Sequence, residues 1–160
     1  MSVAFTKEES AETASETILP DRPIPEGPNL VTKAGLAGLE RMLAAARAAY
    51  DAAMSIEDIN EKRRQAAGPL RDLRYYSERV RTAQVIDPPR SHDQVAFGTS
   101  VTVERADGRV QTYRIVGEDE ADPRAGTISF ASPMSRALMG RGVGAEVSVA
   151  GNAVEITAIG

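Results

Sequence analysis

The spacing of apolar residues predicts two helices in the first half of the chain. Within residues 32–54, apolar side chains recur at alternating intervals of three and four residues, which is the heptad pattern of a helix packed against a partner helix. Thr32 is the expected N-cap of this helix. A second heptad pattern covers residues 59–82. Because only a few residues separate the two patterns, we expect an antiparallel hairpin with its tip near residues 55–60.

The second predicted helix contains a pair of residues that is unfavourable inside a helix. Gly68 and Pro69 lie inside the pattern, and a proline there removes a backbone donor and clashes with the preceding turn. Many positions along both patterns are alanine, which buries little area. We therefore expect a bend at this point, and a hairpin that is the least stable part of the molecule.

From residue 94 onward the apolar period changes to two, which predicts strands. Asp107 and Gly108 indicate a hairpin turn, and Ser132 followed by Pro133 is typical of the start of a short helix. A last hairpin is expected around Gly151 and Asn152. The predicted class is α+β, in which a coiled-coil hairpin precedes a small antiparallel sheet with one short helix.

Residues 1–30 differ from the rest of the chain. They are polar and acidic, and they end in four prolines, so we expect a disordered tail whose simplest role is to keep the protein in solution. The predicted division is a tail over residues 1–30, a hairpin over 31–82 and a C-terminal domain over 83–160. Net charge follows this division, since the tail and the C-terminal domain are acidic and the hairpin is basic.

Composition excludes several classes of function. The chain has no cysteine and one histidine, His92, which excludes a disulfide framework and a zinc site built from these residues. There is no apolar run long enough to cross a membrane and no basic N-terminal signal, so the expected location is cytoplasmic, with no membrane partner. Only 4% of residues are aromatic, so neither a pocket for a small-molecule substrate nor a base-stacking surface is expected.

Several segments of the C-terminal half resemble one family. They form an almost gapless series, which runs from the junction after the hairpin, through the first strands and an acidic loop, to the short helix: TAQVID (82–87), VAFG (95–98), VTV (101–103), YRIVGEDEAD (113–122) and SPMSRALMG (132–140). In these segments the chain resembles the Gre family of bacterial transcript-cleavage factors, GreA and GreB.

The resemblance implies a fold and a partner. It implies an FKBP-like C-terminal domain that docks on RNA polymerase at the rim of the secondary channel, and a hairpin that enters the channel. In such factors two acids at the hairpin tip help the polymerase to hold its second Mg²⁺, and the polymerase then cuts backtracked RNA. The chain would thus have no cofactor of its own, would not itself be an enzyme, and would meet nascent RNA only indirectly.

The tip acids that match the family pattern are Asp58 and Glu61. They lie three residues apart, on one face of a helix, where carboxylates suit a hard cation such as Mg²⁺. The alternative is that they only stabilise the helix start, with Ser55 and Asp58 spaced as in a capping box. Lys62 stands where the family has asparagine, and each hairpin arm is shorter than the family's by about seven residues, or about 10 Å.

Other residues are candidates for contacts with the polymerase or with RNA. The resemblance assigns polymerase contacts to Ser132 and Pro133, and the acidic loop adds Asp119 and Asp122. Basic residues of the second helix could contact RNA or the channel wall, or could simply be solvated: Arg63, Arg64, Arg71 and Arg74. Two functions therefore remain open: stimulation of transcript cleavage, and occupation of the channel without cleavage, in competition with longer factors. A prolyl isomerase is disfavoured because the C-terminal domain has few aromatic residues.

Overall fold

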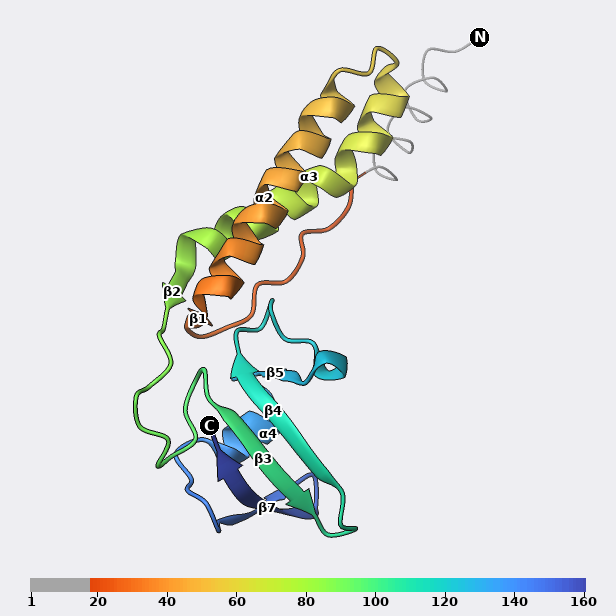
Figure 1. Ribbon diagram of the computed structural model, residues 1–160. Coiled ribbons are helices and arrows are strands. Elements are labelled where there is room, and N and C mark those ends of the chain that lie inside the picture. The colour runs from red at the N-terminus through yellow and green to blue at the C-terminus, as the bar shows by residue number, and fades with distance from the viewer. Residues whose placement is uncertain (1–17) are drawn as a thin grey trace. The chain divides into compact units, whose positions relative to one another are not determined.

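The computed structural model describes residues 18–160 (Figure 1). Contacts divide these residues into two compact units. The helical unit contains residues 18–27 and 39–82, and the sheet unit contains residues 28–38 and 83–160. The boundary after Thr82 coincides with the one expected from sequence, whereas residues 28–38 group with the sheet rather than with the tail or the hairpin. We describe each unit by itself.

Two long helices form the hairpin that the heptad patterns predict. Helix α2 spans Lys33–Met54 and α3 spans Ile59–Thr82, so the tip lies at residues 55–58, inside the expected range. Thr32 caps α2, because its Oγ1 accepts a hydrogen bond from the backbone N–H of Gly35 at 2.9 Å. The α2 residues Leu39, Ala46 and Ala53 are buried at heptad spacing, as the pattern predicts.

Burial along α3 departs from the expected pattern. The heptad pattern over residues 59–82 places Ala66 and Tyr76 on its apolar seam. Ala66 is buried, but beyond Pro69 the buried ring belongs to Tyr75 instead of Tyr76. Two features account for the change. Pro69 lies inside α3, whose ribbon bends along its length (Figure 1), and the Arg22 guanidinium covers the Tyr75 ring at 3.8 Å from its centroid.

The segment before the hairpin also differs from expectation. Residues 1–17 of the expected tail lie outside the described residues. Residues 18–27 contact α3: Asp21 accepts from Arg74 at 3.2 Å, and Arg22 donates to Asp72 at 3.3 Å. The prolines exclude a helix here, but an extended segment can still lie along one, so this part of the expected disordered tail is in contact with the hairpin.

The sheet unit holds one five-stranded sheet, in the order β5-β4-β3-β7-β6. Its strands and helices are β3 (Ser100–Arg105), β4 (Val110–Val116), the 3-10 turn η1 (Pro123–Ala125), β5 (Thr127–Ser129), the short helix α4 (Pro133–Leu138), β6 (Glu146–Val149) and β7 (Asn152–Ile159). The α+β class is confirmed. The sheet is mixed rather than antiparallel, because β5 pairs with β4 in parallel after the chain crosses over through residues 117–126.

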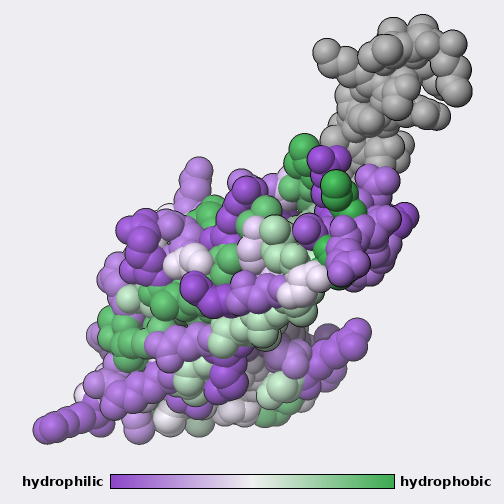
Figure 2. All heavy atoms as spheres, turned by 90° about the horizontal axis from the view of Figure 1, so that it is seen from above, coloured by the Kyte–Doolittle hydropathy of each residue, from purple (hydrophilic) through white to green (hydrophobic). Residues whose placement is uncertain are grey.

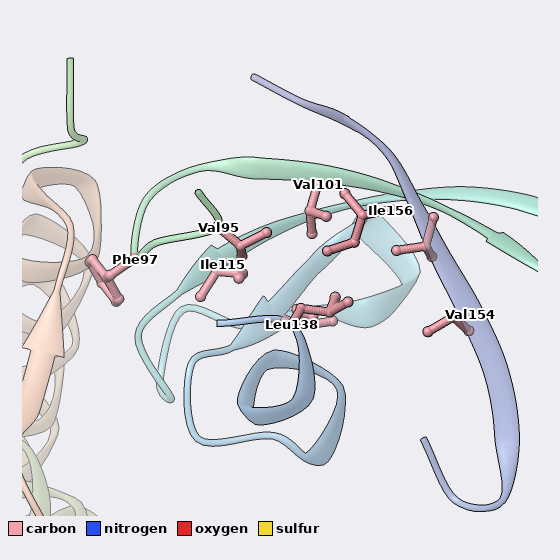
Figure 3. Packing of buried hydrophobic residues seen from close by; sticks show 9 residues of the cluster. Val95, Phe97, Val101, Ile115, Leu138, Val154 and Ile156 are labelled. Atoms are coloured by element: carbon pink, nitrogen blue, oxygen red, sulfur yellow. The ribbon is translucent and has the colours of Figure 1, made fainter. Parts of the chain in front are cut away.

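The core of this unit lies between the sheet and α4 (Figure 3). Val101 and Val103 of β3 are fully buried and alternate with more exposed neighbours, as the period of two predicts. Leu138 of α4 and Ile156 of β7 are also fully buried and join the same cluster. The short helix therefore closes the core of the sheet.

Two turns of the sheet have residues in the left-handed region. Gly108 lies there at φ 86°, in the turn that Asp107 and Gly108 predict. The last hairpin turns at Ala150 and Gly151, both with positive φ, while Asn152 already pairs with Val149. The turn thus lies one residue earlier than the sequence suggested, because register is set by the strand pairing.

A second, two-stranded sheet was not predicted from the sequence. Strand β1 (Asn29–Val31) pairs in parallel with β2 (Ala83–Val85), so the segments before α2 and after α3 are joined. Gly117 permits this packing, because a Cβ there would lie 2.6 Å from the backbone oxygen of Leu30. No helix among residues 18–160 is long and apolar enough to cross a membrane.

Candidate functional site

The hairpin tip presents the two carboxylates that the sequence singled out, Asp58 and Glu61. Asp58 is the N-cap of α3: its Oδ1 accepts from the backbone N–H of Glu61 at 2.8 Å, and its carbonyl oxygen accepts from the N–H of Lys62 at 2.8 Å. The expected capping box at Ser55 does not form, because the Ser55 hydroxyl donates to the backbone oxygen of Asp51. The cap begins three residues later, at Asp58.

The Glu61 carboxylate has partners on its own helix. Its Oε1 accepts from Gln65 Nε2 at 2.9 Å, and its Oε2 accepts from the Arg64 guanidinium in a short ion pair. The hydrogen bond from Gln65 and then that from Arg64 hold the pKa of Glu61 below its ordinary value. Both oxygens of Glu61 are therefore engaged. We did not anticipate these partners, although spacings of three and four residues indicate them.

The four candidate arginines of α3 divide by partner. Arg64 binds Glu61, Arg74 pairs with Asp21 at 3.2 Å, and Arg71 lies 3.5 Å from its neighbour Asp72. Arg63 is exposed and has no ion pair within residues 18–160. Three of the four guanidinium charges are thus partly satisfied inside the helical unit, which leaves Arg63 as the best candidate for an external anion.

The candidates in the sheet unit cluster at the start of α4 and in the acidic loop. Ser132 caps α4, since its Oγ accepts from the backbone N–H of Ser135 at 3.2 Å, and Pro133 follows as an exposed first residue of the helix. Asp122 caps η1 through the N–H of Arg124 at 3.1 Å, while Asp119 is exposed on the same loop. Ser132 and Asp122 therefore each cap a helical turn, and Pro133 begins α4.

The acidic loop has a further contact that the sequence did not reveal. Glu120 Oε2 accepts from the Thr32 hydroxyl at 2.6 Å, at the point where α2 begins. Carboxylates are stabilised at helix N-termini, where free backbone N–H groups and the helix dipole favour negative charge. Glu120 thereby holds the loop against the first turn of α2 within the sheet unit.

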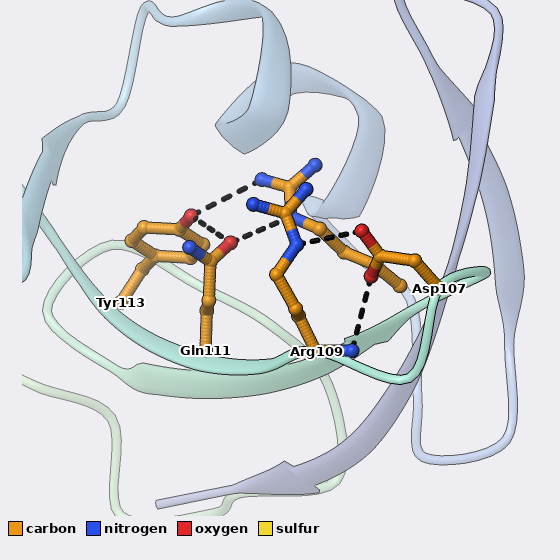
Figure 4. Close-up of polar contacts among 5 residues, drawn as sticks. Asp107, Arg109, Gln111 and Tyr113 are labelled. Carbon is orange, nitrogen blue, oxygen red and sulfur yellow. Dashed lines mark hydrogen bonds and ion pairs between the residues drawn. The ribbon is translucent and has the colours of Figure 1, made fainter.

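A polar cluster covers part of the β3–β4 hairpin (Figure 4). Arg105 donates to Gln111 at 2.6 Å and to the Tyr113 hydroxyl at 3.2 Å, while Arg109 binds Asp107 at the turn. The donors and acceptors of these side chains bond to one another, so the cluster stabilises the β3–β4 hairpin. Across residues 18–160, no three acidic or histidine side chains are grouped so that they could hold a metal ion.

Residues 90–159 match the family model described as the C-terminal part of the transcription elongation factors GreA/GreB. In these residues the chain is similar to the C-terminal part of the Gre factors. The match takes in the five-stranded sheet and α4, and it supports the Gre resemblance of the motifs between residues 95 and 140.

Individual relatives agree with this match. GreA of Desulfovibrio desulfuricans is 44% identical over 104 residues, which are 64% of this chain and 59% of that protein. GreB of Haemophilus ducreyi is 41% identical over 80 residues, about half of each chain. The chain thus spans about three-fifths or less of the length of these curated relatives. The crystal structure of the GreA homologue Gfh1 from Thermus thermophilus covers 84% of this chain and 99% of its own, with 23% identity and a TM-score of 0.40.

Proposed function

We propose that the chain binds bacterial RNA polymerase through its GreA/GreB C-terminal domain and acts during transcript elongation by placing the hairpin in the secondary channel. The match over residues 90–159 supports the partner, and the antiparallel hairpin that precedes this domain supports the mode of action. Any RNA cleavage belongs to the polymerase and its Mg²⁺, so the chain would be a regulator of that reaction.

The state of the tip favours occupation of the channel over strong stimulation of cleavage. A carboxylate that completes a Mg²⁺ site must give its oxygen atoms to the ion. Both Glu61 oxygens already accept hydrogen bonds, from Arg64 and Gln65, and one Asp58 oxygen accepts the helix cap. This engagement of the tip oxygens is the observation that carries the proposal.

Stimulation of cleavage is the second candidate. Asp58 and Glu61 occupy one helical turn at the end of the hairpin. Asp58 is exposed and Glu61 is half-buried, and the second Asp58 oxygen is not used by the cap. Surface contacts of the Arg64 and Gln65 type are weak because solvent screens them, so a strongly bound metal could displace them. The family's reaction thus requires a rearrangement at Glu61 rather than a new fold.

Binding to the polymerase is tested with Pro133→Ala. Pro133 is exposed, so its loss should weaken the affinity for core polymerase about tenfold, or about 1.4 kcal/mol, with little effect on folding. The matched variant Asp58→Ala should change the affinity by no more than about twofold, because hot spots lie in the main interface. Fluorescence anisotropy of the labelled chain measures both, and circular dichroism checks the fold. Equal losses for the two variants would contradict docking through the C-terminal domain.

Cleavage is tested with stalled, backtracked elongation complexes. We expect the natural chain to bind these complexes and to release little cleaved RNA. Asp58→Asn keeps an N-cap acceptor and removes the charge, so it separates the metal role from the capping role. Rapid cleavage with the natural chain, abolished by Asp58→Asn at unchanged affinity, would establish stimulation through the tip acids instead.

A further inference from the structure

An open groove lies on the helical unit near the tip of the hairpin. Its volume is about 670 Å³, and we call it the hairpin groove. Helix α2 contributes Tyr50 and Met54 to its lining, the segment before the helices contributes Ile18 and Leu19, and α3 contributes the rest. Met54 is 45% exposed and Ile59 of α3 is 63% exposed, and hydrophobic residues come to the molecular surface among hydrophilic ones (Figure 2). Such exposed apolar area favours an occupant.

One face of α3 follows the whole length of the hairpin groove. Its lining residues recur at intervals of three and one, which is the spacing of a single stripe along a helix. The stripe begins at Ile59 and ends at Arg74, so it is about 22 Å long at 1.5 Å per residue. Its middle is apolar and consists of Ala66, Ala67 and Leu70. A partner helix of about fifteen residues has the same length.

The stripe is basic on both sides of its apolar middle, and none of the described residues that line the groove is acidic. Lys62 and Arg63 lie toward the tip, and neither has an ion pair within residues 18–160. Arg71 and Arg74 lie at the other end, where each is within 3.5 Å of a carboxylate of the helical unit. Positive charge without a partner is therefore concentrated at the end of the groove near the tip.

Two classes of macromolecule are attracted to a basic groove, namely nucleic acids and acidic proteins. Single-stranded nucleic acid is bound largely by stacking of its bases on aromatic side chains, and Tyr50 is the one aromatic residue among the described residues of the lining. An acidic amphipathic helix instead covers aliphatic side chains with its apolar face and places its carboxylates against basic groups. The aliphatic middle and the basic ends of the hairpin groove therefore favour a helix.

We propose that the hairpin groove binds an amphipathic helix of another protein, with about fifteen residues, one apolar face and carboxylates toward both ends. Its apolar side chains cover Ala66, Ala67 and Leu70, and its carboxylates near the tip pair with Lys62 and Arg63. The acids at this end contribute most, because the arginines at the other end already have partners within the helical unit. This inference goes beyond the proposed function and does not depend on it.

A synthetic peptide labelled with fluorescein tests this surface on the full chain. The peptide has about fifteen residues, with leucines at helical intervals of three and four and glutamates at both ends, and its control has lysine at every glutamate position. In fluorescence anisotropy, the chain should bind the glutamate peptide about tenfold more tightly than the lysine peptide, and this difference should shrink at high salt. The glutamate peptide should also shift the amide NMR signals of Ala66, Ala67 and Leu70.

Variants of the chain locate the contact. Arg63→Glu should weaken binding of the glutamate peptide about tenfold, whereas the matched variant Arg47→Glu, at an exposed α2 residue outside the groove, should change it by less than about twofold. Ile59→Ser should weaken it about fivefold through lost apolar contact, and circular dichroism checks that the exposed substitution leaves the fold intact. Lys62→Glu together with Arg63→Glu should reverse the preference, so that the lysine peptide binds more tightly.

Each contrary result overturns the proposal. Equal affinities for the two peptides, or equal losses from Arg63→Glu and Arg47→Glu, would show that the groove does not select an acidic helix. If a short single-stranded RNA shifts the signals of Ala66, Ala67 and Leu70 and the peptide does not, the groove is a nucleic-acid site instead. If the peptide does not bind and sedimentation shows a dimer that Ile59→Ser dissociates, a second copy of the chain fills the groove.

Discussion

At the scale of single residues, the tip shows how neighbouring carboxylates acquire different roles. The Asp58 carboxylate accepts a hydrogen bond from the backbone of α3, whereas the Glu61 carboxylate accepts hydrogen bonds from two side chains one turn further along the helix. Their three-residue spacing and the capping alternative follow from the sequence alone. The partners of Glu61 could have been foreseen from the helical spacing of Arg64 and Gln65, but the position of the cap could not, because Ser55 and Asp58 are both good N-cap residues.

The first prediction concerns the pKa of Glu61. Gln65→Ala and Arg64→Ala should each raise it toward its ordinary value, with the larger effect from Gln65, whereas Asp58→Asn should lower it further by removing a like charge. Because the folded-state pKa is lowered, the contribution of Glu61 to stability is complete above its unfolded-state pKa and is lost as pH falls through the folded-state value. Carboxyl ¹³C NMR titration measures these shifts, and a drop on Gln65→Ala would contradict the assignment.

The second prediction concerns Ala150. Its φ of 51° lies in the left-handed region, which is unfavourable by about 1–2 kcal/mol for a residue other than glycine or asparagine. Ala150→Asn creates the Asn-Gly pair that this turn prefers, so it should stabilise the protein by about 1 kcal/mol and raise Tm by about 2–4 °C. Ala150→Val is the control and should destabilise it. Thermal unfolding followed by circular dichroism distinguishes the two, and equal Tm values would refute the argument.

At the scale of elements, the spacing of apolar residues predicted the long helices and the longer strands, because these elements are determined by residues close together in the sequence. The heptads located both helices and the tip within a few residues, and the period of two located the strands of the main sheet. The spacing of apolar residues could not predict contacts between segments that are distant in the sequence. Strands β1 and β2 have three residues each, too few to show a period, and the burial of Tyr75 depends on Arg22, which sequence pattern places in a tail.

The third prediction tests the weak point of α3. Pro69→Ala lets residue 69 donate to the carbonyl of Gln65, so it should stabilise the helical unit by up to about 3 kcal/mol. Gly68→Ala alone should gain little, since a residue before proline is disfavoured in helical conformation, although a Cβ there meets no atom within 4 Å. The double variant should gain more stability than the sum of the gains of the two single variants.

Amide hydrogen exchange measures this effect along the hairpin. In the natural chain, exchange over residues 66–70 should be faster than in β4, and in Pro69→Ala it should slow toward the rate of the flanking turns. Gly108→Ala is a control for alanine itself, because it also meets open space but at a φ of 86°, and it should destabilise. Protection over residues 66–70 that already equals that of β4 would show that Pro69 does not weaken the helix.

At the scale of the whole molecule, the length of the hairpin bears on the proposed action of its tip in the polymerase channel. Helix α2 has 22 residues and α3 has 24, so each arm is about 33–36 Å long. The resemblance implies family arms longer by about seven residues, or about 10 Å. A metal ligand must approach to about 2 Å, so this difference outweighs the effect of any single side chain at the tip.

The fourth prediction follows from this length. Inserting one heptad in each arm preserves the register of the apolar positions and advances Asp58 and Glu61 by about 10 Å. The lengthened chain should stimulate cleavage of backtracked RNA more than the natural chain does, at similar affinity for the polymerase. Single-turnover cleavage assays measure the rate. Inserting four residues per arm is the control, because it breaks the heptad register, and equal rates for all three chains would show that reach is not limiting.

Because β1 pairs in parallel with β2, the hairpin is an insertion between two paired strands. Residues 39–82 form the helical part of the excursion, and the segments before and after the two helices, residues 29–31 and 83–85, pair with each other in one short ladder within the sheet unit. Arms could therefore lengthen, shorten or be exchanged by whole heptads without altering the core around Val101, Leu138 and Ile156. A lineage that keeps this ladder can vary the length of its hairpin in evolution while its C-terminal domain stays the same.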